Sequence, residues 1–336
     1  MVLRTRFYRE TRDLTTGTCY AAPVSRKPTT GKMTGKLADN RKTTTAKPTI
    51  AIVGAGSLAT FLAVALHDAG FTITEIVARG SPRSRRRAHA LAAAVGAKAV
   101  TANSAALDAA LLWFSVPDRA IRGAASFLAD ALIARALAHK KATVRFALHS
   151  SGALSSRELD SLHTAGVAVA SVHPLMTFVA GARPGLTGVP FAIEGDDAAT
   201  RVARRIVRKL GGDSFTLPAA RKAAYHAWAT LTSPLLLAFL VALEEAAQAA
   251  GFTRQDARHK SLPIIRQTLA NYSRLGPARS FSGPLIRGDV ETVAKHLAVL
   301  KKRPGAREVY VALARAALRG LPVKNRKGLK RLLRVP

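Results

Sequence analysis

The sequence predicts an α/β protein in which a mostly parallel sheet is followed by an all-helical C-terminal domain. A short apolar, β-branched run at Ile50–Val53 indicates a buried strand. It leads into a glycine-containing turn, and further apolar runs then alternate with helical patterns to about Leu217. Beyond Pro218 the patterns are helical only.

The composition favours a soluble, cytoplasmic protein. The chain has 336 residues, enough for two domains, and 48% of them are hydrophobic. Its one cysteine, Cys19, lies in a polar segment, so we expect neither a disulfide framework nor a cysteine metal site. The nine histidines are dispersed, and no histidine–carboxylate spacing predicts a metal site.

The net charge of +32 has two interpretations. It is typical of proteins that bind nucleic acid or a membrane surface. It also results when arginine is scattered over the solvated faces of an Ala- and Arg-rich chain. Many basic residues lie in the two terminal segments and the others are dispersed, which favours the second interpretation. Aromatic and basic residues are not interleaved, so the sequence does not favour a nucleic-acid partner.

Both ends of the chain are predicted to lie outside the folded domains. Residues 1–48 are rich in Thr, Lys and Arg without an apolar period, which predicts a disordered basic extension, and Met33 is an alternative start. Residues 323–336 form a basic tail that we expect to be loose or weakly helical. The longest apolar run, residues 227–243, is shorter than the about 20 residues of a membrane span. We therefore predict a buried central helix there and no membrane span.

The turn after the first strand carries a dinucleotide-binding pattern. Gly54, Gly56 and Ala59 have the spacing G-x-G-x-x-A, with a strand before them and a helical face after them. The first glycine permits the tight turn, the second lets the backbone approach a pyrophosphate, and Ala59 lets helix and strand pack closely. We predict that the cofactor contacts Gly54, Ala55, Gly56, Ser57 and Leu58.

The residues after the second strand favour NADP over NAD. This strand covers residues 71–78, and the position where an acidic residue would hold the ribose 2′-hydroxyl of NAD is occupied by Arg79. Guanidinium–phosphate hydrogen bonds are bidentate and charge-assisted, so a cation here suits a 2′-phosphate. We assign Arg79 and Ser81 to the cofactor site, and Ser81-Pro82 also begins a helix that runs to about Val95.

Polar turns follow three later strands of the sheet. Strands at residues 98–101 and 110–114 lead into Ser115-Val116-Pro117-Asp118, which we expect to face the cofactor. Strands at residues 143–148 and 167–172 lead into turns that contain Ser151 and His173. Because these turns lie at adjacent strand ends, we assign both residues to substrate binding. Segments 191–194, 197–210 and 214–217 complete the sheet.

The C-terminal helices carry the candidate catalytic residues. We predict helices over residues 219–250, 254–272, 289–302 and 307–319. Lys222 and His226 are four residues apart, so they lie on one helical face and can serve as proton donor and substrate anchor. Ser233 and Arg287 are further candidates for substrate contact, and Asp289 is predicted to cap a helix.

These motifs, in this order, resemble a family of Rossmann-like oxidoreductases whose C-terminal half is a domain of unknown function, of the type numbered 2520. More distantly they resemble ketopantoate reductase, pyrroline-5-carboxylate reductase and the 6-phosphogluconate dehydrogenase group. The resemblance covers about residues 49–321. It is carried by the segments GAGSLA (54–59), SVPD (115–118), HSSGAL (149–154), HPLMTF (173–178), KAAYHAW (222–228) and SGPLIRGDVETVAKHL (282–297).

The resemblance implies a domain organisation and a departure from the family pattern. It implies an NAD(P)-binding Rossmann domain over residues 49–217, with the family's second segment starting near residue 173. An all-helical substrate and dimerisation domain would cover residues 218–322 and form a homodimer. Related dehydrogenases carry Lys and, four residues on, Asn, for which Lys222 and His226 are the closest equivalents. Where the family tends to have Ser-Asn this chain has Ser233-Pro234, and the proline is expected to kink the helix.

Three functional hypotheses follow. The first is an NADP-dependent reductase or dehydrogenase acting on a small carbonyl, hydroxy or imine compound, with NAD as the alternative cofactor. The second is a non-catalytic NADP-binding or sensor protein that has lost its chemistry at Pro234. The third and weakest is a nucleic-acid-binding protein that uses the basic residues of segments 1–48 and 323–336.

Overall fold

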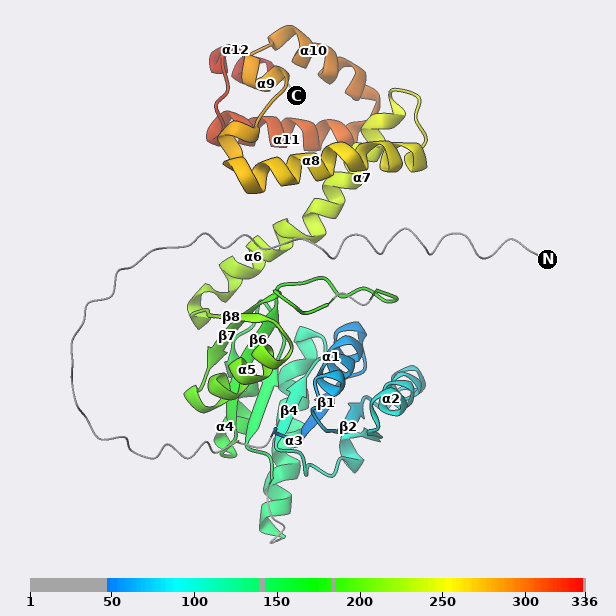
Figure 1. Ribbon diagram of the computed structural model, residues 1–336, viewed down its shortest axis with the longest axis vertical. Coiled ribbons are helices and arrows are strands. Elements are labelled where there is room, and N and C mark those ends of the chain that lie inside the picture. The colour runs from blue at the N-terminus through cyan, green and yellow to red at the C-terminus, as the bar shows by residue number, and fades with distance from the viewer. Residues whose placement is uncertain (1–46, 139–142, 183–184, 335–336) are drawn as a thin grey trace, which may run out of the picture. The chain divides into compact units, whose positions relative to one another are not determined.

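The computed structural model describes residues 47–138, 143–182 and 185–334 (Figure 1). Its sheet has 8 strands in the order β3-β2-β1-β4-β5-β6-β7-β8, and every neighbouring pair is parallel except β6 and β7. This confirms the predicted mostly parallel sheet. The strands are β1 (Ile50–Val53), β2 (Ile73–Ala78), β3 (Lys98–Thr101), β4 (Leu111–Phe114), β5 (Phe146–His149), β6 (Ala168–Pro174), β7 (Pro190–Gly195) and β8 (Asp213–Thr216).

Helices cover both faces of this sheet (Figure 1). One apolar core joins the sheet to α1, α2 and α5, and a second core joins the opposite face to α3 and α4. The central strands are buried on both faces, which explains why they appear in the sequence as continuous apolar runs. The helices of this part are α1 (Ser57–Asp68), α2 (Pro82–Val95), α3 (Asp118–Leu137), α4 (Asp160–Thr164) and α5 (Asp197–Lys209).

In the described residues after β8 the regular elements are helices, as predicted. They are α6 (Lys222–Thr232), α7 (Pro234–Gln248), α8 (Arg254–Ser280), α9 (Pro284–Arg287), α10 (Val290–Val299), α11 (Pro304–Gly320) and α12 (Arg326–Leu332). Short 3-10 turns are η2 (Ala102–Ser104), η3 (Ser156–Leu159), η4 (Ala219–Arg221) and η5 (Leu300–Lys302). The predicted cap at Asp289 is confirmed, because its side chain accepts a hydrogen bond from the Thr292 N–H.

The predicted single helix over residues 219–250 is divided at Ser233. Proline has no N–H for the hydrogen bond of a continuous helix, so α6 ends at Thr232 and Pro234 opens α7 in its first turn. Ser233 has φ −127° and ψ −70°, outside the helical region. The kink that Pro234 predicts is therefore present.

The prediction of a buried central helix at residues 227–243 is wrong. In α6 the buried residues are Lys222 and Tyr225, and in α7 they are Ala242 and Glu244. Most of the apolar side chains between them are exposed, including Trp228 at 53% and Leu237 at 63%. By length and composition the helical stretch Ala219–Gln248 is apolar enough to cross a membrane, which is weak evidence for a span on its own. These apolar residues form a surface that no other part of the described chain covers.

Of the two predictions for the C-terminal segment, loose or weakly helical, the helical one agrees with the structure. Residues 326–332 form α12, and Leu329 and Leu333 are buried in a core with α10 and α11. Arg326 donates hydrogen bonds to the carbonyl oxygens of Leu318 and Leu321. The segment is a short amphipathic helix, because its leucines occupy one face. The many charged residues make this pattern hard to recognise in the sequence. The predictions for residues 1–46 lie outside the described residues.

Candidate cofactor and active site

A cavity of about 830 Å³ lies where the strand order reverses, at the carboxyl ends of β1, β2 and β4. In open α/β sheets this is the place where nucleotides bind. Of the ten predicted cofactor residues, eight line the cavity: Gly54, Ala55, Gly56, Arg79, Ser81, Ser115, Val116 and Pro117. Ser57 and Leu58 are outside the lining and form the first turn of α1, whose N–H groups have no partner within the helix.

The glycines of the fingerprint have different structural duties. Gly54 has φ +121°, and a Cβ there would lie 2.5 Å from the Ser115 carbonyl oxygen, so the fold itself requires glycine. A Cβ on Gly56 would meet no protein atom within 4 Å. Gly56 is also the N-cap of α1 and offers no capping side chain, which leaves the positive end of the helix accessible to an anion.

Two observations indicate that the cavity can hold a dinucleotide. The space that a Cβ on Gly56 would occupy is open, as a close backbone approach to a pyrophosphate requires. Ser115 lines the cavity and is 9% exposed, and its buried hydroxyl has no hydrogen-bond partner within the described residues. Buried hydroxyls are normally paired, so this one is poised for a ligand.

The Gly56→Ala variant is expected to fold like the wild type while binding NADPH at least about 10-fold more weakly. The added methyl contacts no protein atom and the φ of −83° suits alanine, but the methyl occupies the open cofactor space. Thermal unfolding and NADPH titration measure the two effects separately. The matched Gly54→Ala variant should instead lose stability because its methyl clashes with the Ser115 backbone. Normal NADPH affinity of Gly56→Ala would contradict this placement of the pyrophosphate.

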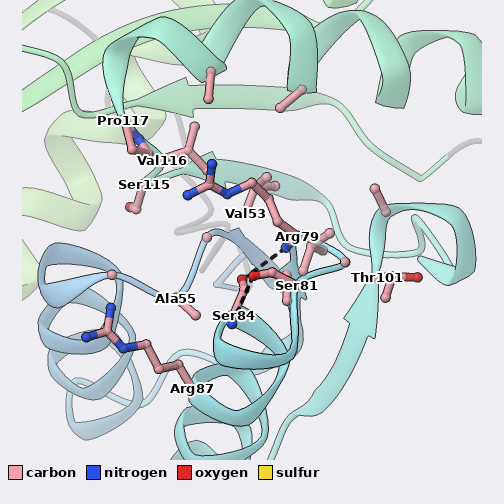
Figure 2. A pocket seen from close by; sticks show the side chains of 18 of the residues that line it. Val53, Ala55, Arg79, Ser81, Ser84, Arg87, Thr101, Ser115, Val116 and Pro117 are labelled. Carbon is pink, nitrogen blue, oxygen red and sulfur yellow. Dashed lines mark hydrogen bonds between the residues drawn. The ribbon is translucent and has the colours of Figure 1, made fainter.

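Three arginines reach the cavity from the end of β2 and from α2. Arg79, Arg83 and Arg87 all line it, and Arg79 extends over it toward Val116 (Figure 2). The turn that holds them is fixed by two hydrogen bonds, because the Ser81 hydroxyl accepts from the Ser84 N–H and the Ser84 hydroxyl accepts from the Arg79 N–H (Figure 2). The helix cap that Ser81 predicts is therefore confirmed.

A second group of polar residues is gathered by α6. Lys222 is 2% exposed, and its ammonium donates hydrogen bonds to the Ser151 carbonyl oxygen at 2.9 Å and to the Ser171 hydroxyl at 2.5 Å. An ammonium has three donors, so one remains for another acceptor. Burial lowers the pKa of Lys222 from 10.5 to about 8, and the nearby Glu194 and Asp118 carboxylates oppose that shift.

His173 lies beside this lysine and is held by Tyr225. Its Nδ1 is hydrogen-bonded to the Tyr225 hydroxyl at 2.8 Å, with the two rings edge to face. Burial and the neighbouring Lys222 charge lower the pKa of His173 to about 4, so the ring is neutral at pH 7. Its Nε2 faces Gly152, where a Cβ would lie 2.8 Å from both that nitrogen and His226. Tyr225 is buried, and burial raises its pKa to about 12.

The structure gives Ser151 a clear set of partners. Its hydroxyl donates to Asp118 at 2.9 Å and accepts from the backbone N–H groups of Ala153 and Leu154. The same turn is fixed by His149, whose Nδ1 accepts from the Ser151 N–H and whose Nε2 binds the Ser155 carbonyl oxygen. Burial lowers the pKa of His149 to about 4, which keeps it neutral. The Ser151 side chain thus holds the turn, and its carbonyl oxygen receives Lys222.

Four of the six predicted catalytic and substrate residues therefore lie together: Lys222, His226, Ser151 and His173. Ser233 stands at the break between α6 and α7, 11 residues after Lys222, or about 16 Å along a helix. Arg287 is exposed at the end of α9, and none of its contacts in the described chain joins it to this group. Their assignment to the substrate stays a prediction.

Sequence reasoning missed Arg87, Ser171 and Tyr225. Arg87 is four residues after Arg83 on α2, and this spacing places both on one helical face. Ser171 points to the same side of β6 as His173, two residues on. Tyr225 lies one helical turn after Lys222. Each spacing is visible in the sequence. Many other residues share such spacings, so the spacings alone do not identify these three as site residues.

Comparison with known proteins matches two family models to the chain. Residues 49–141 match the NADP oxidoreductase, coenzyme F420-dependent family, and residues 189–317 match the domain of unknown function DUF2520. No curated protein matches the chain.

Solved structures of related architecture cover most of the chain. A protein of Bacteroides fragilis assigned as an NADP oxidoreductase is 23% identical, with a TM-score of 0.66 over 80% of this chain and 97% of that one. An imine reductase of Streptomyces aurantiacus is 18% identical, with a TM-score of 0.53 over 85% and 99%. A pyrroline-5-carboxylate reductase of Coxiella burnetii is 15% identical, with a TM-score of 0.51 over 85% and 99%. These likenesses establish the fold.

The sheet order and the cavity at its switch point define a Rossmann-fold protein, and its residues 49–141 match the NADP oxidoreductase family. Residues 189–317, which follow this domain, match DUF2520, so the chain is similar to proteins in which the two domains occur in this order. The predicted resemblance, including its more distant relation to pyrroline-5-carboxylate reductase, is confirmed. Among the residues described, no group of three or more His, Cys, Asp or Glu side chains could hold a metal ion.

Proposed function

We propose that the protein is an NADP-dependent reductase or dehydrogenase that transfers a hydride to or from a small carbonyl, hydroxy or imine compound. The observation that carries the proposal is the hydrogen bond between Ser151 and Asp118. Asp118 directly follows the cofactor loop Ser115-Val116-Pro117, and the Ser151 carbonyl oxygen receives Lys222. The cofactor cavity and the Lys222 group are therefore neighbours.

The nicotinamide cofactor would be held by the α1 N-terminus, Ser115 and Arg79, and it supplies the hydride when bound. Reduction of a C=O or C=N bond also consumes one proton. With a pKa of about 8, Lys222 is protonated at pH 7 and still able to release its proton, as a general acid requires. We therefore assign proton donation to Lys222, with His226 as the second candidate.

His173 is suited to hold the substrate. When the Tyr225 hydroxyl donates to Nδ1, the neutral ring carries its proton on Nε2, the nitrogen that faces Gly152. An N–H there can donate to a carbonyl oxygen or an imine nitrogen. Because the pKa of His173 is about 4, this nitrogen does not compete with Lys222 as a proton source at pH 7.

The direct test follows NADPH oxidation by its nicotinamide absorbance with a panel of cyclic imines and small aldehydes, ketones and 2-oxo acids. We expect turnover with at least one class and faster oxidation of NADPH than of NADH. The Arg287→Ala variant should raise KM more than it lowers kcat if Arg287 binds substrate. Tight NADPH binding without turnover on any compound would favour the second hypothesis.

That second hypothesis, an NADP-binding protein without catalysis, is favoured by the break at Ser233-Pro234. Pro234 stands where the resemblance places an Asn, so the side-chain amide is absent, and the proline changes the direction of the helix. Gain of turnover in the Pro234→Asn variant would support this loss of activity. Equal or lower turnover in Pro234→Asn would argue that the break belongs to a working site.

We also propose that the protein is a homodimer through its C-terminal helices. The helices α6 and α7 expose an apolar surface that a soluble single chain rarely carries. Arg258 of α8 pairs with the buried Glu244 at 2.8 Å and secures α7 to its neighbour, so the surface is held in place. The surface is formed by Trp228, Leu231, Leu235, Leu236, Leu237 and Val241.

Replacing Leu231 and Leu237 by Lys is expected to convert the dimer to a monomer by weakening association at least about 100-fold, because two buried ammonium groups would replace apolar contacts. Light scattering after size exclusion measures the mass. The matched Ile133→Lys variant, which changes an exposed apolar residue of α3, should remain dimeric. A monomeric wild type, or one that requires vesicles or detergent to stay in solution, would contradict the dimer and point to a membrane.

The oxidoreductase fold supports a soluble protein with a small-molecule substrate, and we expect it in the cytoplasm. The proposed function, with the cofactor cavity and the Lys222 group as its site, involves no nucleic-acid partner.

A further inference from the structure

The helices α11 and α12 line an open, strongly basic pocket of about 530 Å³. Two leucines and six cationic side chains line it, and within the described chain no Asp or Glu does so. It shares no residue with the cofactor cavity. Its lining residues are Arg315, Leu318, Arg319, Arg326, Lys327, Lys330, Leu333 and Arg334.

The walls of this basic pocket are fixed by packing and by hydrogen bonds. Leu333 is buried in the core that joins α10, α11 and α12. The Arg315 guanidinium donates to the Leu333 carbonyl oxygen, and Arg326 donates to the carbonyl oxygens of Leu318 and Leu321. Carbonyl oxygens hold a guanidinium in place without neutralising it, so both groups keep their full charge.

The remaining cations of the basic pocket have no such partners. Arg319, Lys327, Lys330 and Arg334 make no side-chain hydrogen bond or ion pair to any residue in the described ranges. All four are exposed, so their long side chains can turn toward a ligand.

The helix dipole accounts for part of this arrangement. Cations are favourable in the last turn of a helix, where Arg319 and Lys330 stand in α11 and α12. Lys327 lies in the first turn of α12, where no acidic residue is present, and Arg326 beside it is bound to carbonyl oxygens at the C-terminal end of α11. The cationic side chains that line the pocket repel one another, because none of them has an acidic partner there among the described residues. An anion in the pocket removes that repulsion.

We propose that this basic pocket binds a compact anion carrying several phosphate groups, of the inorganic triphosphate or nucleoside polyphosphate type. Several unpartnered donors converge on a concavity, which matches clustered phosphate oxygens. Nucleic acid is less suited, because the lining offers no aromatic side chain on which a base could stack. A bilayer is less suited because its surface cannot enter a pocket.

The test uses inorganic triphosphate as the probe in isothermal titration of the full chain. The cofactor cavity also carries arginines, so the titration is made with saturating NADPH and repeated in the Arg79→Asp background. We expect one site that survives both conditions, binds orthophosphate at least about 10-fold more weakly, and loses affinity as salt rises.

Matched charge reversals locate the site. The Arg319→Glu/Lys330→Glu variant should weaken triphosphate binding at least about 30-fold. The Lys260→Glu/Arg266→Glu variant, which makes the same charge change at exposed positions of α8, should change it less than about twofold. Circular dichroism verifies the fold, and Arg319→Gln/Lys330→Gln provides a milder substitution of the same side chains.

Three results would overturn the proposal. One is the absence of binding heat when NADPH is saturating and also in the Arg79→Asp background. Another is an equal loss of affinity in the pocket and control variants, which would assign binding to net charge. The third is binding of a single-stranded RNA or of phosphatidylglycerol vesicles without binding of triphosphate, which would assign the surface to a macromolecular partner.

Discussion

The Arg79→Asp variant is expected to bind NADPH at least about 100-fold more weakly than the wild type and NADH within about threefold. Arg79 lies at the end of β2, lines the cofactor cavity and extends over it (Figure 2). The substitution would remove the charge-assisted hydrogen bond that we assign to Arg79 and the 2′-phosphate, and it would place a carboxylate there. A carboxylate repels phosphate but accepts a hydrogen bond from the ribose 2′-hydroxyl of NADH. Nicotinamide fluorescence measures both affinities.

The chain offers a matched control for this prediction. Arg85 lies on the same helix as Arg83 and Arg87 but outside the cavity lining, and Arg85→Asp makes the same change in net charge. We expect it to change NADPH affinity less than about twofold. Equal effects of the two variants would mean that long-range charge, not a 2′-phosphate site, determines the affinity. Unchanged NADPH binding in Arg79→Asp would move the phosphate contact to Arg83 or Arg87.

The Lys222→Met variant is expected to lose turnover by about 10²–10⁴-fold while binding NADPH within about threefold of the wild type. Lys222 lies outside the cofactor lining, so its removal leaves the cofactor contacts in place. With a pKa of about 8, wild-type kcat for reduction should fall as the pH rises above 8, because the proton donor is lost. Steady-state rates from pH 6 to 10 measure this limb.

The stability of the same variant distinguishes a functional lysine from a structural one. At pH 7 Lys222 is protonated in both the folded and the unfolded protein, so folding carries the cost of burying the ammonium, up to about 3 kcal/mol. Between pH 8 and 10.5 the folded protein releases this proton first, and the cost disappears. Urea unfolding should therefore show Lys222→Met more stable than the wild type at pH 7, with a smaller difference at pH 10.

A destabilised Lys222→Met with normal turnover would assign Lys222 to structure, as an anchor for the turns at Ser151 and Ser171. Those two residues also bond to each other, through the Ser171 hydroxyl and the Ser151 carbonyl oxygen at 3.2 Å, which lessens the loss when the ammonium is removed. The Lys209→Met variant, which changes an exposed lysine of α5, is the control for a general effect of charge.

The order of the elements in the first part of the chain could be predicted because local patterns determine it. Buried parallel strands form continuous apolar runs, and Ser81-Pro82 and Asp289 carry helix starts in their own side chains. The predictions for β1 and β3 agree with the structure residue for residue. The sequence predicts the strand β7 at residues 191–194, but its antiparallel direction could not be predicted because direction depends on the partner strand.

The candidate site could be predicted only in part. Motifs placed Gly54, Arg79 and Ser115 at the cofactor cavity because strand ends of a parallel sheet meet at one edge. The hydrogen bond from Lys222 to the Ser151 carbonyl oxygen links residues that are 71 positions apart in the sequence. The hydrogen bond between His173 and Tyr225 links residues that are 52 positions apart. Such contacts depend on where α6 packs, which no local pattern contains.

By itself, the sequence determined the parallel sheet and the dinucleotide turn, and it predicted a preference for a phosphate-bearing cofactor, because each of these depends on neighbouring residues or fixed spacings. Tertiary structure alone decided the rest. It buried Lys222, exposed the apolar side chains of α6 and α7, and packed the leucines of α12 to form the basic pocket. Burial, pKa and surface all depend on which segments far apart in the chain come together, and hydrophobicity read along the chain does not say which surfaces remain uncovered.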